Sequence, residues 1–138
     1  MEIRAQGLQL SLRVAQPPDQ EGWIKLDVEV TVAGFSGRCL GWIQHDDLGR
    51  FADALQQMDA TVGEPSKAVL SSAEPDIKIE LSMDRRGHVV GRYAFESERR
   101  DGIPTVLSGA FEMDRSFLPA LRREVAELVV VSFSGPSL

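Results

Sequence analysis

The stretch Ile24-Lys25-Leu26-Asp27-Val28-Glu29-Val30-Thr31-Val32 decides the fold class, because apolar and polar residues alternate along its whole length. A period of two is typical of a β-strand with one face buried and the other in water. The same alternation occurs over residues 8–14 and 77–83. The pattern therefore predicts several half-buried strands that share an apolar face.

Short turns separate these strands. Residues 17–22 open with two prolines, which cannot continue a strand ladder, and Gly34–Gly37 is typical of a hairpin loop. Residues 84–87 and 99–102 each end in glycine and predict two more turns. Strands joined by short turns pair antiparallel. We therefore expect one mainly antiparallel sheet of six to seven strands.

Two segments carry a helical period instead. Apolar residues recur at spacings of three and four over about 46–59 and about 115–130. Asp46 or Asp47 is a suitable N-cap for the first helix, and Asp114 or Ser116 for the second. With both helices packed on the sheet, the expected fold is α+β. No linker interrupts the 138 residues, so we expect a single domain over 1–138.

The charge balance limits the possible partners. Fifteen Lys and Arg against 21 Asp and Glu leave a net charge of −6, which repels phosphate and argues against direct nucleic-acid binding. No run approaches the roughly 18–20 apolar residues that span a membrane. The N-terminus shows no basic segment followed by an apolar one, so we expect no signal peptide. The single Cys39 cannot form an internal disulfide. We expect a cytoplasmic protein that favours a basic partner.

Motifs for chemistry are missing from the sequence. It has no P-loop, nucleophile elbow or dinucleotide fingerprint. Cys39 lies among apolar strand residues, which is typical of an inert buried thiol. His45 and His88 lack further ligands at metal-binding spacing, and helix capping accounts for Asp46 and Asp47 beside His45. We expect no catalytic residue, metal or cofactor, and therefore no enzyme.

Besides a binding protein with a basic partner, two other hypotheses about function remain open. One is a small enzyme or an anion- or ligand-binding domain, with a site formed by Arg85, Arg86 and His88 near the acidic hairpin residues Glu96 and Glu98. The other is a structural homo-oligomer in which Val129–Phe133 adds a strand to a neighbouring sheet edge.

The local sequence at several turns resembles that of a known protein family. The loop Gly34–Gly37, a following strand with Trp42 near its end and an acidic helix start form one part of the resemblance. Arg86-Gly87-His88-Val89 and Asp114, which leads into the last helix, form the rest. Over roughly residues 8–128 the chain resembles the WapI-type family of bacterial immunity proteins, associated with polymorphic contact-dependent toxins.

The resemblance implies a non-enzymatic inhibitor that binds a cognate toxin domain, in that family typically a nuclease. Carboxylates on such an inhibitor attract a basic nuclease and can occupy positions meant for phosphates. The candidate partner-binding residues are acidic and lie in the loop of residues 17–22, at the start of the first helix and just before the turn at residues 99–102. They are Asp19, Glu21, Asp46, Asp47, Glu96 and Glu98.

Overall fold

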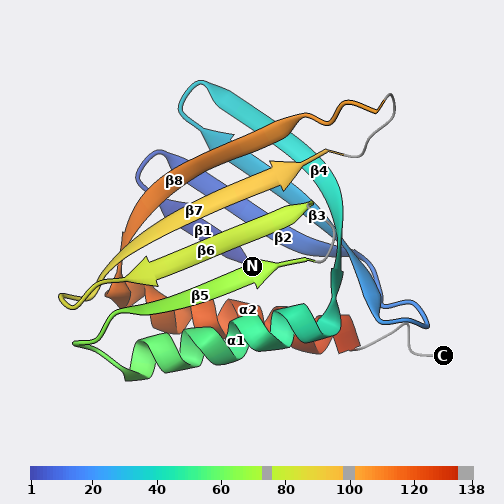
Figure 1. Cartoon of the computed structure of the whole chain (residues 1–138). Helices are drawn as coiled ribbons and strands as arrows, with labels where there is room; N and C mark the ends of the chain where they lie inside the picture. Colours follow the sequence, from blue (N-terminus) through green and yellow to red (C-terminus); the bar gives the residue numbers. More distant parts are fainter. Residues whose placement is uncertain (73–75, 98–101, 134–138) are drawn as a thin grey trace.

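The computed structural model describes residues 1–72, 76–97 and 102–133. Within these residues it has eight strands, two α-helices and one short 3-10 helix (Figure 1). Their order is β1 (Glu2–Ala5), β2 (Leu8–Gln16), β3 (Trp23–Val32), β4 (Phe35–Gln44), α1 (His45–Ala60), β5 (Ser66–Ser71), β6 (Ile77–Met83), β7 (His88–Glu96), β8 (Val106–Asp114), η1 (Arg115–Phe117) and α2 (Leu118–Phe133).

The strands form two antiparallel sheets of four, β1-β2-β3-β4 and β5-β6-β7-β8. The α+β class is confirmed, but the prediction of one sheet with six to seven strands is wrong. Helix α1 has 16 residues and carries the chain about 24 Å, so β5 begins away from β4 and pairs with β6. The alternation shows which face of each strand is buried, but it does not show which strands are neighbours.

Two local features of the first sheet also differ from the prediction. The short β1, which pairs with β2, was not expected because Glu2–Ala5 carries too few apolar residues to show a period. The hairpin loop is shorter than the predicted Gly34–Gly37. It contains only Ala33 and Gly34, and Phe35 already pairs with Val32. Gly34 has a φ of 84°, which favours glycine, so one glycine is enough for this turn.

The two sheets and the two helices enclose one continuous core. Strand β4 contacts β6 and β7, and β1 contacts β8, so the apolar faces of the sheets meet. The helices lie side by side along the bottom of the sheets in Figure 1, with α1 against β5 and α2 against β1 and β2. Residues with period two on β3 and period 3.6 on α1 are fully buried in this core: Ile24, Leu26, Val28, Leu48, Phe51, Leu55 and Met58.

Glycines in the second sheet make room for two aromatic rings. Gly91 pairs with Phe111, and Tyr93 pairs with Gly109. The rings of Tyr93 and Phe111 lie with their centroids 6.3 Å apart, and each ring covers the glycine with which its own residue pairs. A Cβ at Gly91 would lie 2.1 Å from Phe111 Cζ, so an alanine cannot fit unless the ring moves.

Both predicted helices are present, with a different start for the second. The prediction of 46–59 agrees with α1, whereas α2 begins at Leu118 after η1, whose N-cap Asp114 accepts the Ser116 N–H at 2.8 Å. Residues 129–133 belong to α2, so the hypothesis that they add a strand to a neighbouring sheet is wrong. Within the described ranges, neither helix is long and apolar enough to cross a membrane.

Candidate functional site

The turn between β2 and β3 is organised by Asp19. Its Oδ1 accepts the backbone N–H groups of Glu21 at 2.9 Å and Trp23 at 3.0 Å. The carbonyl of Gly22 accepts the His45 N–H at 3.3 Å, which ties the turn to the start of α1. Asp19 and Glu21 are both exposed. The turn thus presents two carboxylates in a position set by backbone hydrogen bonds.

The two aspartates at the start of α1 have different environments. Asp46 is exposed, whereas Asp47 is only 9% exposed and pairs with Arg50. Asp47 Oδ2 also accepts the Gln44 N–H at 3.0 Å. The N-cap is therefore Gln44, and Asp47 completes a capping box from the third helical position, which corrects the predicted cap at Asp46 or Asp47. Asp47 stabilises the helix start and offers little surface to a partner.

A hollow that the sequence did not predict lies beside this turn. Its volume is about 320 Å³, and Asp19, Trp23, Trp42 and Asp76 line it. In the strand register Trp23 pairs with Gln44 and Lys25 with Trp42, so the tryptophans are diagonal neighbours on the outer face of the first sheet. The hairpin register of β3 and β4 was the signal that could have placed the two rings together.

Asp76 joins the ends of the two sheets. Its Oδ2 accepts the Trp42 N–H of the first sheet at 3.3 Å, and its carbonyl accepts the Glu96 N–H of the second sheet at 3.0 Å. Glu96 is half-buried, and the predicted site residue Glu98 lies outside the described residues. We call Asp19, Glu21, Asp46 and Asp76 the acidic end of the molecule, because the hydrogen bonds above connect their segments.

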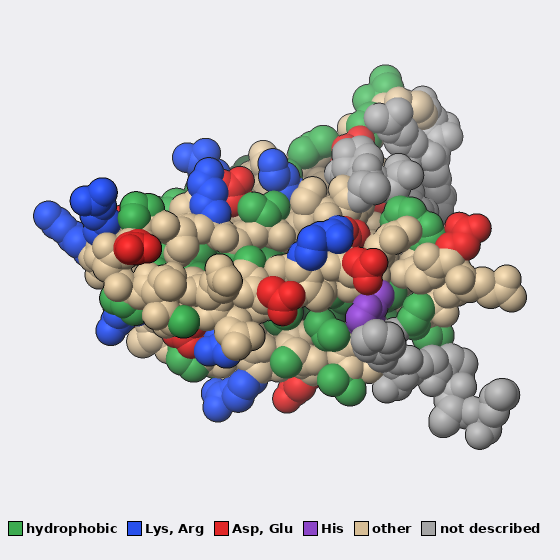
Figure 2. Space-filling model, turned by 60° about the horizontal axis from the view of Figure 1, so that its bottom comes forward, with side chains coloured by type: hydrophobic (Ala, Val, Ile, Leu, Met, Phe, Trp, Pro, Cys, Tyr) green, Lys and Arg blue, Asp and Glu red, His purple; other side chains and the backbone are tan. Residues whose placement is uncertain are grey.

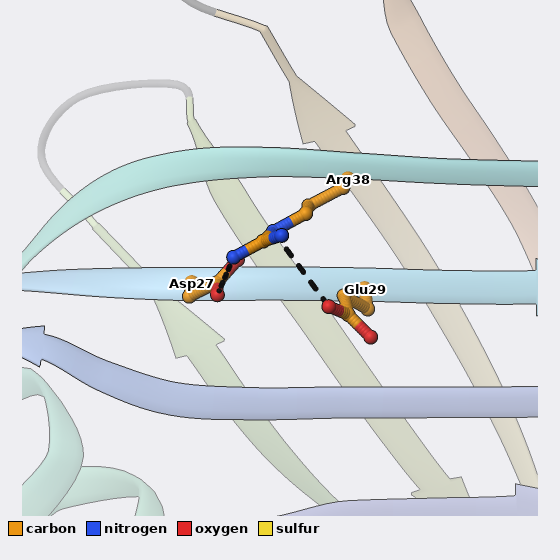
Figure 3. Close-up of polar contacts among 3 residues, drawn as sticks. All are labelled: Asp27, Glu29 and Arg38. Atoms are coloured by element: carbon orange, nitrogen blue, oxygen red, sulfur yellow. Dashed lines mark hydrogen bonds and ion pairs between the residues drawn. The ribbon is translucent and has the colours of Figure 1, made fainter.

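The outer face of the first sheet continues from this end as a row of compensated charges. Figure 3 shows Arg38 of β4 reaching across to Asp27 and Glu29 of β3. Arg38 donates to both oxygens of Asp27, at 2.9 and 2.6 Å, and its Nε lies 3.6 Å from Glu29 Oε1. The hydrogen bonds from Arg38 lower the pKa of the Asp27 carboxyl. Because Arg38 compensates both carboxylates, we do not include them in the acidic end.

The residues of the alternative site lie at the other end of β7. His88 begins this nine-residue strand and Glu96 ends it, which places them about 26 Å apart. Arg85 and Arg86 are exposed in the preceding turn, and His88 Nε2 lies 3.6 Å from Glu112 Oε1. The hypothesis of one site that combines the Arg85–His88 turn with the acidic hairpin is therefore not supported for the described residues.

Charged side chains are unevenly distributed over the molecule. Figure 2 shows several Lys and Arg side chains gathered at the left end, where the β6–β7 hairpin lies in Figure 1, while carboxylates lie mainly from the middle toward the right end. The right end contains the ends of β4 and β7 and the start of α1. On this face, therefore, basic side chains are most numerous toward the β6–β7 hairpin.

Other groups that could carry chemistry are inert or scattered. Cys39 is half-buried, and its burial, followed by the charges of Asp76 and Asp27, raises the pKa of the thiol. A raised pKa keeps the sulfur protonated near neutral pH and disfavours a nucleophile. Across residues 1–72, 76–97 and 102–133, no group of three or more His, Cys, Asp or Glu residues could hold a metal ion.

The chain is similar in structure to the plant transcriptional regulator PBF-2, with a TM-score of 0.49 and 6% identity over 96% of this chain and 81% of the other. No curated protein matches the sequence significantly. The model of the Immunity protein WapI-like family matches residues 2–130, nearly the whole chain. The chain therefore belongs to the WapI-like immunity protein family.

Proposed function

We propose that this chain is a non-enzymatic immunity protein that binds a basic nuclease domain of a bacterial toxin in the cytoplasm and neutralises it. The family match over residues 2–130 carries the proposal of toxin neutralisation. The acidic end supports the finer proposal of a basic partner, because a concentrated negative charge speeds the encounter with a cationic surface.

The acidic end is suited to docking because its parts hold one another in place. Asp19 accepts two backbone N–H groups, the turn is hydrogen-bonded to α1, and Asp76 links both sheets. A surface ordered before binding loses little conformational entropy when the complex forms. A nuclease surface that binds phosphates would meet carboxylates at fixed positions there.

The test starts from the neighbouring genes: a toxin-like reading frame found there is co-expressed with this chain, and the lack of one would contradict the proposal. We expect growth of the toxin-producing cells to be restored and the purified pair to form a stable complex. The variant Glu21→Gln/Asp46→Asn removes two exposed charges of the acidic end, and Asp53→Asn/Glu64→Gln removes two exposed charges elsewhere. Both variants change the net charge equally, so a difference between them reports position.

We expect the association rate constant to fall several-fold in the acidic-end variant, with a shallower dependence on salt, and to fall much less in the control. Cells that remain poisoned by the neighbouring toxin would contradict the immunity function. Equal association rates for the two variants would contradict the acidic end as the docking surface.

A further inference from the structure

The hollow at Asp19, Trp23, Trp42 and Asp76 has a composition that core packing does not explain. Both tryptophans lie on the outer face of β3 and β4, half-buried, while the inward residues of the same strands fill the core. Its volume of about 320 Å³ reaches the lower limit of about 300 Å³ that is usual for ligand pockets. Two indole rings and two carboxylates therefore share a space large enough for a side chain.

The chemistry of this hollow favours a cation. The face of an indole ring attracts positive charge, and Lys25 Nζ lies over the Trp42 ring, 5.4 Å from its centroid. The hollow therefore already attracts one ammonium, and its two carboxylates outnumber this single positive charge. Asp19 and Asp76 add negative charge from two different segments. A carboxylate offers about four acceptor positions, so the two backbone bonds at Asp19 leave capacity for another donor.

Among natural cationic side chains, arginine fits best. A guanidinium is planar, so it can stack flat on an aromatic ring and form paired hydrogen bonds with a carboxylate. A lysine ammonium can lie over a ring, as Lys25 does, but it is a point charge without a planar face or a paired donor set. Tryptophan and arginine are also enriched among the residues that dominate binding energy at protein interfaces. We infer that this hollow receives an arginine side chain of the toxin partner and anchors the complex.

The walls of the hollow are formed before any partner arrives. Trp23 and Trp42 belong to paired strands, Trp42 is hydrogen-bonded to Asp76, and Asp19 is held by the turn. Glu21 and Asp46 of the acidic end are exposed and follow closely in the chain on the lining residues Asp19 and Trp42. A basic surface that this end attracts would therefore deliver an arginine to a ready site. This inference rests on the proposed function for the partner, but its chemistry can be tested without one.

The test uses the two tryptophans of the chain, both of which line the hollow, as its own reporters. The full chain is titrated with the peptide acetyl-Gly-Arg-Gly-amide while tryptophan emission and the indole N–H resonances are followed. The matched probe carries citrulline, which has nearly the shape of arginine without its charge. We expect a saturable change with arginine and about tenfold weaker binding with citrulline.

Two variants separate the hollow from general charge. Asp19→Asn/Asp76→Asn keeps acceptor oxygens for the backbone bonds but removes both charges, and we expect about a tenfold loss of arginine binding. Asp53→Asn/Glu64→Gln is the matched control, and we expect it to bind as the parent chain does. Circular dichroism of each variant shows whether the fold is intact, and Trp42→Phe, which keeps an aromatic ring, provides a second variant that weakens binding.

Equal responses to arginine and citrulline, or no response in the tryptophan signals, would overturn the inference. The co-expression assay does not depend on either result. If the chain protects cells but binds no arginine, only the inference of an arginine site is refuted. Arginine binding by a chain that protects against no toxin would refute the proposed function and keep the cation site.

Discussion

The substitution Gly91→Ala tests whether the Phe111 ring packs too closely on Gly91 to leave room for a methyl group. The new Cβ would lie 2.1 Å from Phe111 Cζ and within 2.5 Å of both adjacent ring carbons, where contacts of about 3.5–4.0 Å are normal. The ring must therefore retreat by about 1.5 Å. Phe111 is 6% exposed and stacked on Tyr93, so its movement disturbs the packing of both rings.

Overpacking of this kind costs about 1–3 kcal/mol, and the lower chain entropy of alanine in the unfolded state returns about 0.4–1 kcal/mol. We expect a net loss of about 1–2 kcal/mol in the free energy of unfolding. Urea unfolding followed by far-ultraviolet circular dichroism measures it. Gly49→Ala is the control, because nothing lies within 4 Å of a Cβ at this position in α1. There we expect a gain of about 0.5–1 kcal/mol.

A double-mutant cycle with Phe111→Leu identifies the ring as the cause. A smaller side chain at position 111 leaves room for the new methyl group, so the cost of Gly91→Ala should fall by about 0.5 kcal/mol or more in that background. The reasoning is refuted if Gly91→Ala stabilises the protein as much as Gly49→Ala does. It is also refuted if the cost is the same with Phe111 and with Leu at that position.

Two further predictions concern ionisable groups. Arg38→Met should raise the pKa of Asp27, which the hydrogen bonds from Arg38 lower in the folded chain; carboxyl NMR titration measures it. Because the pKa of Asp27 is lower in the folded chain than in the unfolded chain, the stability that Arg38 adds should be complete above the unfolded pKa and disappear as the pH falls through the folded pKa. An equal loss of unfolding free energy from Arg38→Met at pH 6 and at pH 2 would contradict this. Iodoacetamide should modify Cys39 more slowly in the folded chain at pH 7 than in urea, because burial raises the pKa of the thiol. Equal rates in the two states would show that the thiol is accessible and unperturbed.

The acidic end and the opposite end of the molecule differ in their charges. It lies where β4 passes into α1 and where Asp76 joins the sheets, so its residues are tied to the core through short connections. The opposite end has the β6–β7 turn, in which Asp84 Oδ1 accepts the N–H groups of Arg86 and His88. At this second end the exposed Arg85 and Arg86 have the carboxylate of Asp84 in the same turn, so the two ends differ in their balance of charge.

The amino-acid sequence alone determined most of the local structure. The alternation over residues 24–32 and 77–83 located strands and their buried faces, and the apolar stripe Leu48–Met58 located a helix, because each depends only on residues that are near in the chain. The same local logic placed acidic residues in turns and at the helix start. It could not show that Asp47 turns inward to Gln44 and Arg50, since that depends on how the helix begins.

Only the tertiary structure decided how these elements combine. A period of two specifies which side of a strand is buried but not which strand lies beside it, so the division into two sheets followed from the path of α1. For the same reason the sequence could have placed the two tryptophans together through the β3–β4 hairpin, but it could not add Asp76 to them. Trp42 and Asp76 are 34 residues apart, and they meet only because the ends of the two sheets are brought together over a shared core.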